Sequence, residues 1–456
     1  MTSPRLARRR SAVAIAALVA VAACTPSTPD SAVSGADPSP EPTSEEPGAE
    51  PSPDPETSPE PTQEPEPEFE PAEFTIVSSG DVLPHATVNC SADWATTGDA
   101  WEAYPQNCTQ TWPGDGQGWD FYPLMAGVEH WIAGADLALC SLEVPIAPEG
   151  EQVTAYPMFG APDELIAGLG ELGFDGCNTA TNHSMDRGSA GLMRTLDLLD
   201  EAGMGHVGTA RTETEAEQPQ LYVLERGGRE ITIAHIAGTT IDNGLPPPAD
   251  QPWMVSDADP DRLSEQARQA REDGADLVIA SLHWGIEYVH EPVTEQLEIA
   301  EALAADGQID LIYGNHSHTP QPIETLDGGP HGTGMPVVWS MGNFISNQDE
   351  LCCIMETATG TMVVATVAVD TEGVAQVTDL QWAANTVDRL GAQRIWPLAE
   401  LLETDPAERP SGLQLSEADL ERRYARVTEV MGTELERPEA PEPSGEPVVV
   451  VPRSQE

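Results

Sequence analysis

The chain has 456 residues, enough for one large domain or two ordinary ones with a substantial core. Asp and Glu outnumber Lys and Arg by 77 to 20, which gives a formal net charge of -57. Because phosphate backbones need clustered basic residues, this composition excludes nucleic acid as an expected partner. An acidic polymer would also be repelled unless divalent cations mediated the contact. A general adaptation to solubility or high salt accounts for the acidity equally well.

The N-terminus has the pattern of an export signal. Arg5 and residues 8–10 precede an apolar run over 12–23, which is too short to span a bilayer but typical of a signal peptide. The run ends at Cys24 and resembles the bacterial lipobox, in which the cysteine is lipidated after cleavage. We therefore expect residues 1–24 to be a lipoprotein signal peptide and the protein to lie on the extracellular face of the cell membrane. An ordinary signal peptide cut near Ala23 is the alternative.

Residues 25–73 are dominated by Pro, Glu, Ser, Thr and Asp and contain 14 acidic and no basic residues. With little apolar surface to bury, this segment is predicted to be a disordered tether. An extended polyproline II chain at about 3.1 Å per residue would reach roughly 150 Å, which suits a membrane-anchored protein that works in the cell wall. The similar composition of residues 438–456 predicts a second disordered tail.

Six cysteines follow the signal peptide, and an exported protein is permitted disulfides. Cys90 with Cys108, which enclose a segment rich in Trp, Gly and Asn, is the preferred pair. Cys140 and Cys177 lie in apolar, strand-like segments and are either buried thiols or a second pair. The adjacent cysteines at 352–353 receive no role. Because no Cys-x-x-Cys spacing occurs, His and carboxylate are favoured over thiolate as metal ligands.

From residue 74 onward, short apolar runs alternate with segments of helical length. Strands are predicted at Phe74–Val77, Asp136–Cys140, Ile231–Ile236, Asp276–Ala280, Ile309–Ile312 and Val337–Trp339. Helices are predicted between them, at Ser189–Ala202 and Asp261–Gly274. Strands separated by helices imply crossover connections, with helices packed on the faces of a sheet.

The C-terminal part adds an antiparallel component. Thr361–Val369 and Val374–Trp382 flank a short turn and predict a hairpin, and Ser416–Met431 predicts a terminal helix opened by a Ser416 and Asp419 cap. The fold class is therefore α/β, with one main domain over 74–400 and a helical segment over 401–437.

Polar residues with metal-binding or acid–base chemistry follow the predicted strands where each strand ends: Asp81, Glu143, Asn182, His183, His283, His316 and His318. Sites assemble at the carboxyl ends of strands in layered α/β proteins, because the loops converge there on a rigid scaffold. Carboxylate oxygen and neutral imidazole nitrogen are ligands for divalent metals, and two such ions suit a phosphoryl displacement. A serine nucleophile is disfavoured because no G-x-S-x-G elbow occurs.

Six motifs occur in the order found in a known family: Gly80-Asp81, Ser141–Glu143, Thr181–Gly188, His283–Tyr288, Gly314–His318 and Ser340–Phe344. Together they resemble the CapA family, the poly-gamma-glutamate capsule synthesis proteins, which is similar to the calcineurin-like metallophosphoesterases. The likeness covers roughly residues 74 to 390. It implies a four-layered α/β/β/α sandwich with the site at one edge.

The resemblance also implies roles for single residues. The implied metal ligands are Asp81 and His318 on a first ion, Glu143 as a bridge, and Asn182, His283 and His316 on a second ion, with Mn, Fe, Zn and Mg not distinguished. His183 would be a general acid or a phosphate contact. Asp186 would either orient His183 or cap the helix near Ser189. Arg187 would meet an anionic substrate or lie on the surface, and Asn343 would add a polar contact.

Three positions depart from the family pattern. Residue 83 is Leu where metallophosphoesterases carry a His, Ser141 replaces an Asn, and Glu143 replaces a shorter Asp. The first metal position therefore has one imidazole fewer, although His85 lies close in sequence. The remaining histidines end no motif and are interpreted as structural, surface or loop residues: His206, His235, His290 and His331.

Three functions stay open at this point. The first is a lipid-anchored protein that synthesises, exports or anchors a poly-gamma-glutamate-type polymer together with membrane polymer-synthesis proteins. The second is a metal-dependent hydrolase of a phosphate-containing envelope substrate. The third is a binding scaffold whose metal site has decayed.

Overall fold

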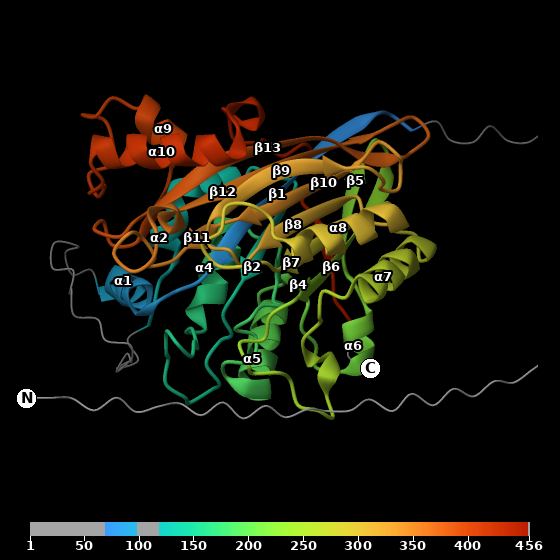
Figure 1. Cartoon of the computed structure of the whole chain (residues 1–456), viewed down its shortest axis with the longest axis horizontal. Coiled ribbons are helices and arrows are strands. Elements are labelled where there is room, and N and C mark those ends of the chain that lie inside the picture. Colours follow the sequence, from blue (N-terminus) through green and yellow to red (C-terminus); the bar gives the residue numbers. More distant parts are fainter. Residues whose placement is uncertain (1–68, 98–117, 455–456) are drawn as a thin grey trace, which may run out of the picture. The chain divides into compact units, whose positions relative to one another are not determined.

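Two β-sheets packed face to face form the centre of the fold (Figure 1). In this computed structural model, the described residues are 69–97 and 118–454. The first sheet has the order β14-β13-β12-β1-β2-β3-β4, and β11 also pairs with β1. Its strands are β1 (Ala72–Val82), β2 (Leu137–Leu142), β3 (Gly176–Asn178), β4 (Gly205–Val207), β11 (Asn343–Ile345), β12 (Thr359–Val369), β13 (Ala375–Asp388) and β14 (Arg394–Pro397).

The second sheet has the order β15-β5-β6-β7-β8-β10-β9. Its strands are β5 (Gln220–Arg226), β6 (Arg229–Thr239), β7 (Leu277–His283), β8 (Leu311–Asn315), β9 (Pro320–Leu326), β10 (Met335–Met341) and β15 (Val449–Val451). Strands β1 to β4 run parallel to one another, as do β6, β7, β8 and β10, so the carboxyl ends of each set meet at one edge.

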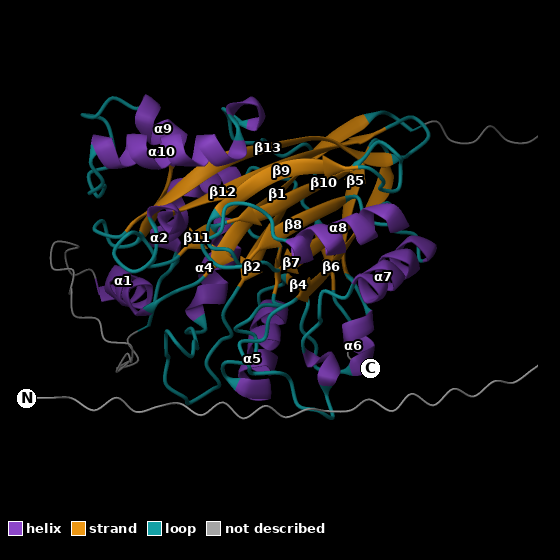
Figure 2. Cartoon of the chain, viewed as in Figure 1, coloured by secondary structure: helices purple, strands orange, loops and turns teal. Residues whose placement is uncertain are grey.

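Helices cover the outer faces of both sheets (Figure 2). The helices are α1 (Ala86–Thr97), α2 (Tyr122–Met125), α3 (Glu129–Ile132), α4 (Glu164–Leu172), α5 (Gly188–Glu201), α6 (Glu213–Glu217), α7 (Pro260–Glu272), α8 (Thr294–Asp306), α9 (Leu398–Glu403) and α10 (Glu417–Met431). Side chains of α1 to α5 pack on the first sheet, and side chains of α7 and α8 pack on the second. No helix in the described part of the chain is both long and apolar enough to cross a bilayer.

Alternation along the strands explains these layers. In β1, Ile76 packs between the sheets and Val77 packs against the outer helices; in β6, Ile233 and Ala234 divide in the same way. Because both of their faces are covered, the central strands β2, β7 and β8 are buried along their whole length, whereas β5, β9 and β13 keep exposed polar residues. The predicted α/β/β/α sandwich is confirmed.

The predicted elements are found close to their expected bounds. Each predicted strand lies within or overlaps a strand of the structure, and the predicted helices correspond to α5 and α7. The hairpin is formed by β12 and β13, which pair antiparallel. Helix α10 begins after Ser416, whose hydroxyl accepts the backbone N–H of Asp419, as the capping pattern predicted. The signal peptide, Cys24, the tether up to residue 68 and Cys108 lie outside the described residues, so the predictions on them, the Cys90–Cys108 pair included, stay predictions.

The predicted disorder of residues 438–456 is wrong for the described part, which ends at Ser454. Strand β15 adds to the edge of the second sheet by pairing with β5. Ser444 donates from its backbone nitrogen and its hydroxyl to Asp136 Oδ1, at 2.7 and 2.9 Å, and that carboxylate also forms a buried ion pair with Arg226. Composition alone missed this, because the segment is ordered by a sheet edge and by buried charges contributed from elsewhere in the chain.

Arg453 fastens the end of the tail to the rest of the fold. Its guanidinium donates to the carbonyl oxygens of His206, at 3.0 Å, and Thr209, at 3.3 Å, and to that of Glu215. Burial lowers the pKa of Arg453 to about 10, which still leaves the side chain charged at neutral pH.

We therefore expect Arg453→Ala to lower the free energy of unfolding by about 2 to 4 kcal/mol, since three carbonyl groups lose a charged donor. Urea denaturation at pH 7 measures the change. Arg268→Ala is the matched control, because Arg268 pairs with exposed glutamates on its own helix, so its loss should leave stability almost unchanged. An Arg453 variant as stable as this control would contradict the structural role of the tail.

Candidate metal centre

The carboxyl ends of the two sheets bring the predicted ligands together. Asp81 lies near the end of β1 and Glu143 directly follows β2, its parallel neighbour. In the second sheet, His283 ends β7 and His316 directly follows β8, again parallel neighbours. Asn182 reaches the same place from the loop after β3. All these side chains are at least nine-tenths buried.

One half of the centre consists of Asp81, Glu143 and His318. One ligand atom from each lies within 4.8 Å of the others. His318 Nδ1 is 3.4 Å from Asp81 Oδ2, and His318 Nε2 is 3.7 Å from Glu143 Oε1. The imidazole of His318 therefore lies between two carboxylates.

The other half converges on His283 Nε2. This atom is 3.0 Å from Asn182 Oδ1, 3.2 Å from His316 Nδ1 and 3.9 Å from Glu143 Oε1. Ligand atoms held about 2.1 Å from one ion lie about 3.0 to 3.5 Å from each other, so the two shorter distances match the spacing of ligands around a divalent ion. Glu143 lies close to both halves.

Two of these side chains have polar atoms with no partner. Among the described residues, both carboxylate oxygens of Glu143 and Nδ1 of His283 are buried without a hydrogen bond. Burying a carboxylate without compensation is costly. Divalent metal is the group that fits such a set of oxygen and nitrogen donors, so the residues present pass this test for a metal site.

Burial also shifts the pKa values of the proposed ligands. Burial raises the pKa of Glu143 well above its ordinary value; His318 opposes this rise and Asp81 adds to it. Burial lowers the pKa of His283 far below the ordinary value and that of His316 to about 3, so both rings are neutral, as ligation requires. Burial alone would also lower the pKa of His318, but the charges of Glu143 and Asp81 outweigh it and raise this pKa to about 9.

The backbone at the centre is strained. His316 and His318 adopt positive φ values of 96° and 56°, and Tyr288 in the neighbouring loop has φ 64°. Non-glycine residues in this region cost about 1 to 3 kcal/mol each and gather at functional sites. The amide of His316 donates to Asp81 Oδ2 at 3.1 Å, which ties this turn to the end of β1.

Neighbouring polar groups hold the ligands in place. Ser141, which replaces the family's usual Asn, donates from its hydroxyl to Asp81 Oδ1 at 3.0 Å. Asn343 Oδ1 is 3.0 Å from His318 Nδ1, so the predicted polar contact of Asn343 is with a proposed ligand. Gly80 packs against the carbonyl of Gly342, where a β-carbon would collide, which explains the glycine before Asp81. Such contacts fix ligand orientation.

His183 lies beside the ligands but bonds to none of them. Its Nδ1 is 2.8 Å from Asp186 Oδ2, which also accepts the backbone N–H of Phe159 at 2.7 Å. The ring of Phe159 meets His183 edge-on, with centroids 4.8 Å apart. Asp186 therefore orients His183 and does not cap helix α5. The N-cap residue of α5 is Arg187, and no side chain caps that end of the helix.

Arg187 makes structural contacts with neighbouring groups of the protein. It forms an ion pair with Glu151 and donates to Thr154 Oγ1 at 3.0 Å, so it fastens the loop before α4 to the start of α5. Its side chain packs against Gly160 and Gly191, where a β-carbon would press on it.

The structure decides between the two alternatives for Cys140 and Cys177, and it shows that His85 also lies beside the site. Cys140 and Cys177 form a disulfide between β2 and β3, just before the loops that carry Glu143 and Asn182. The ring of His85 packs edge-on against Phe159 with centroids 5.4 Å apart, and burial lowers its pKa to about 3. Its position four residues after Asp81 was the only sequence signal for this.

The histidines outside the motifs lie elsewhere. His206, buried on β4 of the first sheet, contacts Asp200 at 3.0 Å, and His235, buried on β6 of the second sheet, contacts Ser281 Oγ at 2.8 Å. His290 and His331 lie in loops, as expected.

Residues 75–348, more than half of the chain, match the family described as "Bacterial capsule synthesis protein PGA_cap". The chain belongs to this family. Relatives include the "PGA biosynthesis protein CapA" of Bacillus subtilis (strain 168), 30% identical over 186 residues that cover 41% of this chain and 46% of the relative. The "Capsule biosynthesis protein CapA" of Bacillus anthracis is 30% identical over 195 residues, with 41% and 44% coverage. The chain thus spans less than half the length of these PGA_cap relatives.

Another relative, from Mycobacterium tuberculosis, bears the name "Probable polyglutamine synthesis accessory protein" and is 27% identical over 302 residues, with 60% of this chain and 78% of the relative covered. Among solved structures, the calcineurin-like phosphoesterase YfkN of Bacillus subtilis is 12% identical, with a TM-score of 0.36 and coverage of 79% and 97%. The NAD nucleotidase of Haemophilus influenzae is 13% identical, with a TM-score of 0.39 and coverage of 79% and 60%.

Proposed function

We propose that this protein takes part in the synthesis, export or anchoring of an anionic envelope polymer of the poly-gamma-glutamate type, and that it does so through a divalent-metal site. Membership of a capsule synthesis family supports the class of process. The Bacillus relatives, whose names refer to PGA and capsule biosynthesis, support the class of polymer. The observation that carries the metal site is the Glu143 carboxylate, since both of its oxygens are buried without a hydrogen bond among the described residues.

The proposed ligands divide between two ions. Asp81 and His318 would hold the first, Asn182, His283 and His316 the second, and Glu143 would bridge them, as its distances of 3.7 and 3.9 Å to His318 and His283 support. When bound, such ions supply Lewis acidity toward an anionic group of the substrate. Ser141 and Asn343 would orient Asp81 and His318, and the low pKa values of His283 and His316 keep their lone pairs available for ligation.

Charge supports a role for cations in this chain. With a net charge of -57, the protein repels an acidic polymer over most of its surface. Divalent ions at the strand ends would reverse the sign of the local charge, so an anionic group would be attracted to this edge.

The proposed location is the outer face of the cell membrane. A lipid on Cys24 and a tether that ends before β1 would let the metal-binding part work at a distance from the bilayer. Membrane polymer-synthesis proteins are the proposed partners.

Elemental analysis of the purified protein tests the metal site. We expect between one and two divalent ions per chain, and the loss of at least one ion in Asp81→Ala and in His316→Ala, because each removes a ligand. His331→Ala is the matched control, since this loop histidine pairs with Asp310 away from the centre and should leave the metal content unchanged. A stoichiometry below one in the wild-type protein would favour a binding scaffold without metal.

Metal binding should depend on pH. In the metal-free protein the pKa of His318 is about 9, so at pH 7.5 this ring must release a proton before it binds metal, and the pKa of Glu143 is raised as well; we therefore expect at least one proton to be released per first ion. Calorimetric titration in buffers of different ionisation enthalpy measures this number. Protons compete with the first ion for His318 below about pH 9, so the affinity for this ion should fall as the pH is lowered toward about 6, whereas the low pKa values of His283 and His316 spare the second ion from this competition. A first-ion affinity that stays constant over this range would contradict ligation by His318.

A second candidate function, a metal-dependent phosphoesterase of an envelope substrate, is favoured by one observation. His183 is a buried imidazole that adjoins the proposed ligand Asn182, and Asp186 holds its Nδ1 at 2.8 Å. This contact fixes the orientation of the ring, so that Nε2 is the nitrogen left to exchange a proton with a substrate. A residue that only supported the ligands would not need this arrangement.

His183→Ala separates the two functions. If the protein is a hydrolase, the metal-loaded wild-type protein cleaves a generic phosphodiester such as bis-p-nitrophenyl phosphate, and the variant loses at least about 100-fold in rate while its metal content stays the same. The absence of cleavage by metal-loaded wild-type protein would contradict hydrolysis of this substrate class and leave the metal-dependent polymer function in place.

A further inference from the structure

Tyr288 ends the motif His283–Tyr288, yet neither the proposed ions nor the proposed proton donor uses it. It is an aromatic residue in the left-handed region, with φ 64°, a conformation that its side chain disfavours. Its amide donates to the carbonyl of Ser317 at 2.7 Å, between His316 and His318. The loop after β7 is thereby tied to the turn that carries two proposed ligands.

The side chain of Tyr288 lies over this turn. Its ring centroid is 6.2 Å from that of His318. Its hydroxyl accepts a hydrogen bond from Gln348 Nε2 at 3.5 Å, and Gln348 Oε1 accepts one from Asn343 Nδ2 at 2.9 Å. Because Asn343 also contacts His318 Nδ1, the phenol belongs to a polar chain that ends on a proposed ligand.

The hydroxyl of Tyr288 already faces a negative charge. Burial and the neighbouring side chains of Glu287 and Cys353 raise the pKa of this hydroxyl. Glu287 is exposed, yet its carboxylate acts on both His318 and Glu143, so it lies beside the centre. An exposed glutamate exchanges rotamers readily, so another anionic oxygen can take its place on the hydroxyl.

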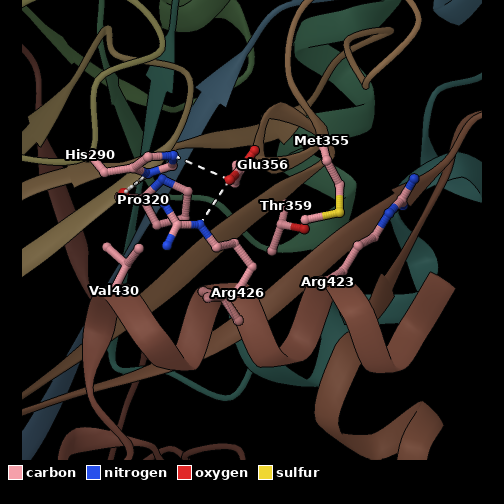
Figure 3. Close-up of a pocket in the computed structure, with 9 residues that line it drawn as sticks. His290, Pro320, Met355, Glu356, Thr359, Arg423, Arg426 and Val430 are labelled. Carbon is pink, nitrogen blue, oxygen red and sulfur yellow. Dashed lines mark hydrogen bonds and ion pairs between the residues drawn. The ribbon is translucent and has the colours of Figure 1, made fainter. Parts of the chain in front are cut away.

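The loop that carries Tyr288 is fixed on its far side as well (Figure 3). His290 Nδ1 is 3.3 Å from the carbonyl of Pro320, and His290 Nε2 is 3.5 Å from Glu356 Oε1. Arg426 of α10 donates to the same Glu356 oxygen at 2.8 Å. Held on both sides, the phenol is positioned before any ligand arrives.

We propose that Tyr288 contacts the substrate: its hydroxyl donates a hydrogen bond to an anionic oxygen of a ligand bound on the His318 side of the centre, in place of Glu287. This inference rests on the proposed metal site. The chemistry recognised is an oxyanion, and both a phosphoryl group and a side-chain carboxylate of a glutamate polymer supply one.

The test uses the full chain loaded with Mn²⁺, whose uptake is measured first. Inorganic phosphate and a γ-linked glutamate trimer are then titrated separately by calorimetry. We expect Tyr288→Phe to weaken the binding of at least one probe about tenfold, because a hydrogen bond to a charged group is lost. Mn²⁺ affinity should stay within about twofold of wild type, which a merely structural role of the hydroxyl would not explain. Weakening for phosphate alone or for the trimer alone identifies the source of the oxyanion.

Two further variants sharpen the result. Tyr424→Phe is the matched control. It removes a hydroxyl on α10 that donates to Glu436 at 2.8 Å, and it should leave anion binding unchanged. Glu287→Gln should tighten anion binding, because it removes the carboxylate that competes for the Tyr288 hydroxyl. If Glu287→Gln binds the anions only as tightly as the wild-type protein does, the exchange of Glu287 for ligand is contradicted.

Failure of the proposed metal site and failure of the proposed role of Tyr288 give different results. If wild-type protein takes up no Mn²⁺, the proposed metal site fails and this inference fails with it. If Mn²⁺ binds but Tyr288→Phe holds both probes as tightly as wild type, or wild type holds neither, only the role of Tyr288 is overturned. Loss of Mn²⁺ from Tyr288→Phe would also overturn it, since the hydroxyl would then support the metal ligands.

Discussion

The buried negative charge of Glu143 and Asp81 is the constraint on which the rest of the centre depends. Two carboxylates taken from water at the meeting edge of two sheets require positive charge nearby. Without metal, His318 supplies it, and its pKa of about 9 records how strongly the two carboxylates hold that proton. A single imidazolium leaves both oxygens of Glu143 without a hydrogen bond, so one proton does not complete the charge balance.

The layered fold creates this constraint and also keeps it in place. Parallel strands deliver side chains to one edge only at their carboxyl ends, so residues up to about 240 positions apart in sequence become neighbours. The strands there cannot separate to admit water, because helices cover their outer faces and the disulfide between Cys140 and Cys177 joins β2 to β3. Rigid strand ends therefore hold the charges together, and strained turns at His316 and His318 aim the rings.

Much of this arrangement could be predicted from the sequence. Apolar runs that end in Asp81, His283 or His316 predicted strand ends, and a common edge followed from the parallel topology. The proximity of the six proposed ligands was therefore predictable, whereas the distances were not. The tail was mispredicted because Pro and Glu dominate its composition, while its order comes from Arg453, Ser444 and an open strand edge on β5, which are long-range contacts.

Residues with two local interpretations were the ones that sequence could not resolve. Asp186 and Arg187 stand side by side before α5, and either suits a helix start or a site. The structure turns Asp186 to His183 and turns Arg187 to Glu151, because the Phe159 loop provides a backbone donor on one side and a carboxylate on the other. The loop before α4 thus orders the residues on both sides of the centre. Arg187, the arginine of the motif Thr181–Gly188, forms its ion pair with an acidic side chain of the protein itself.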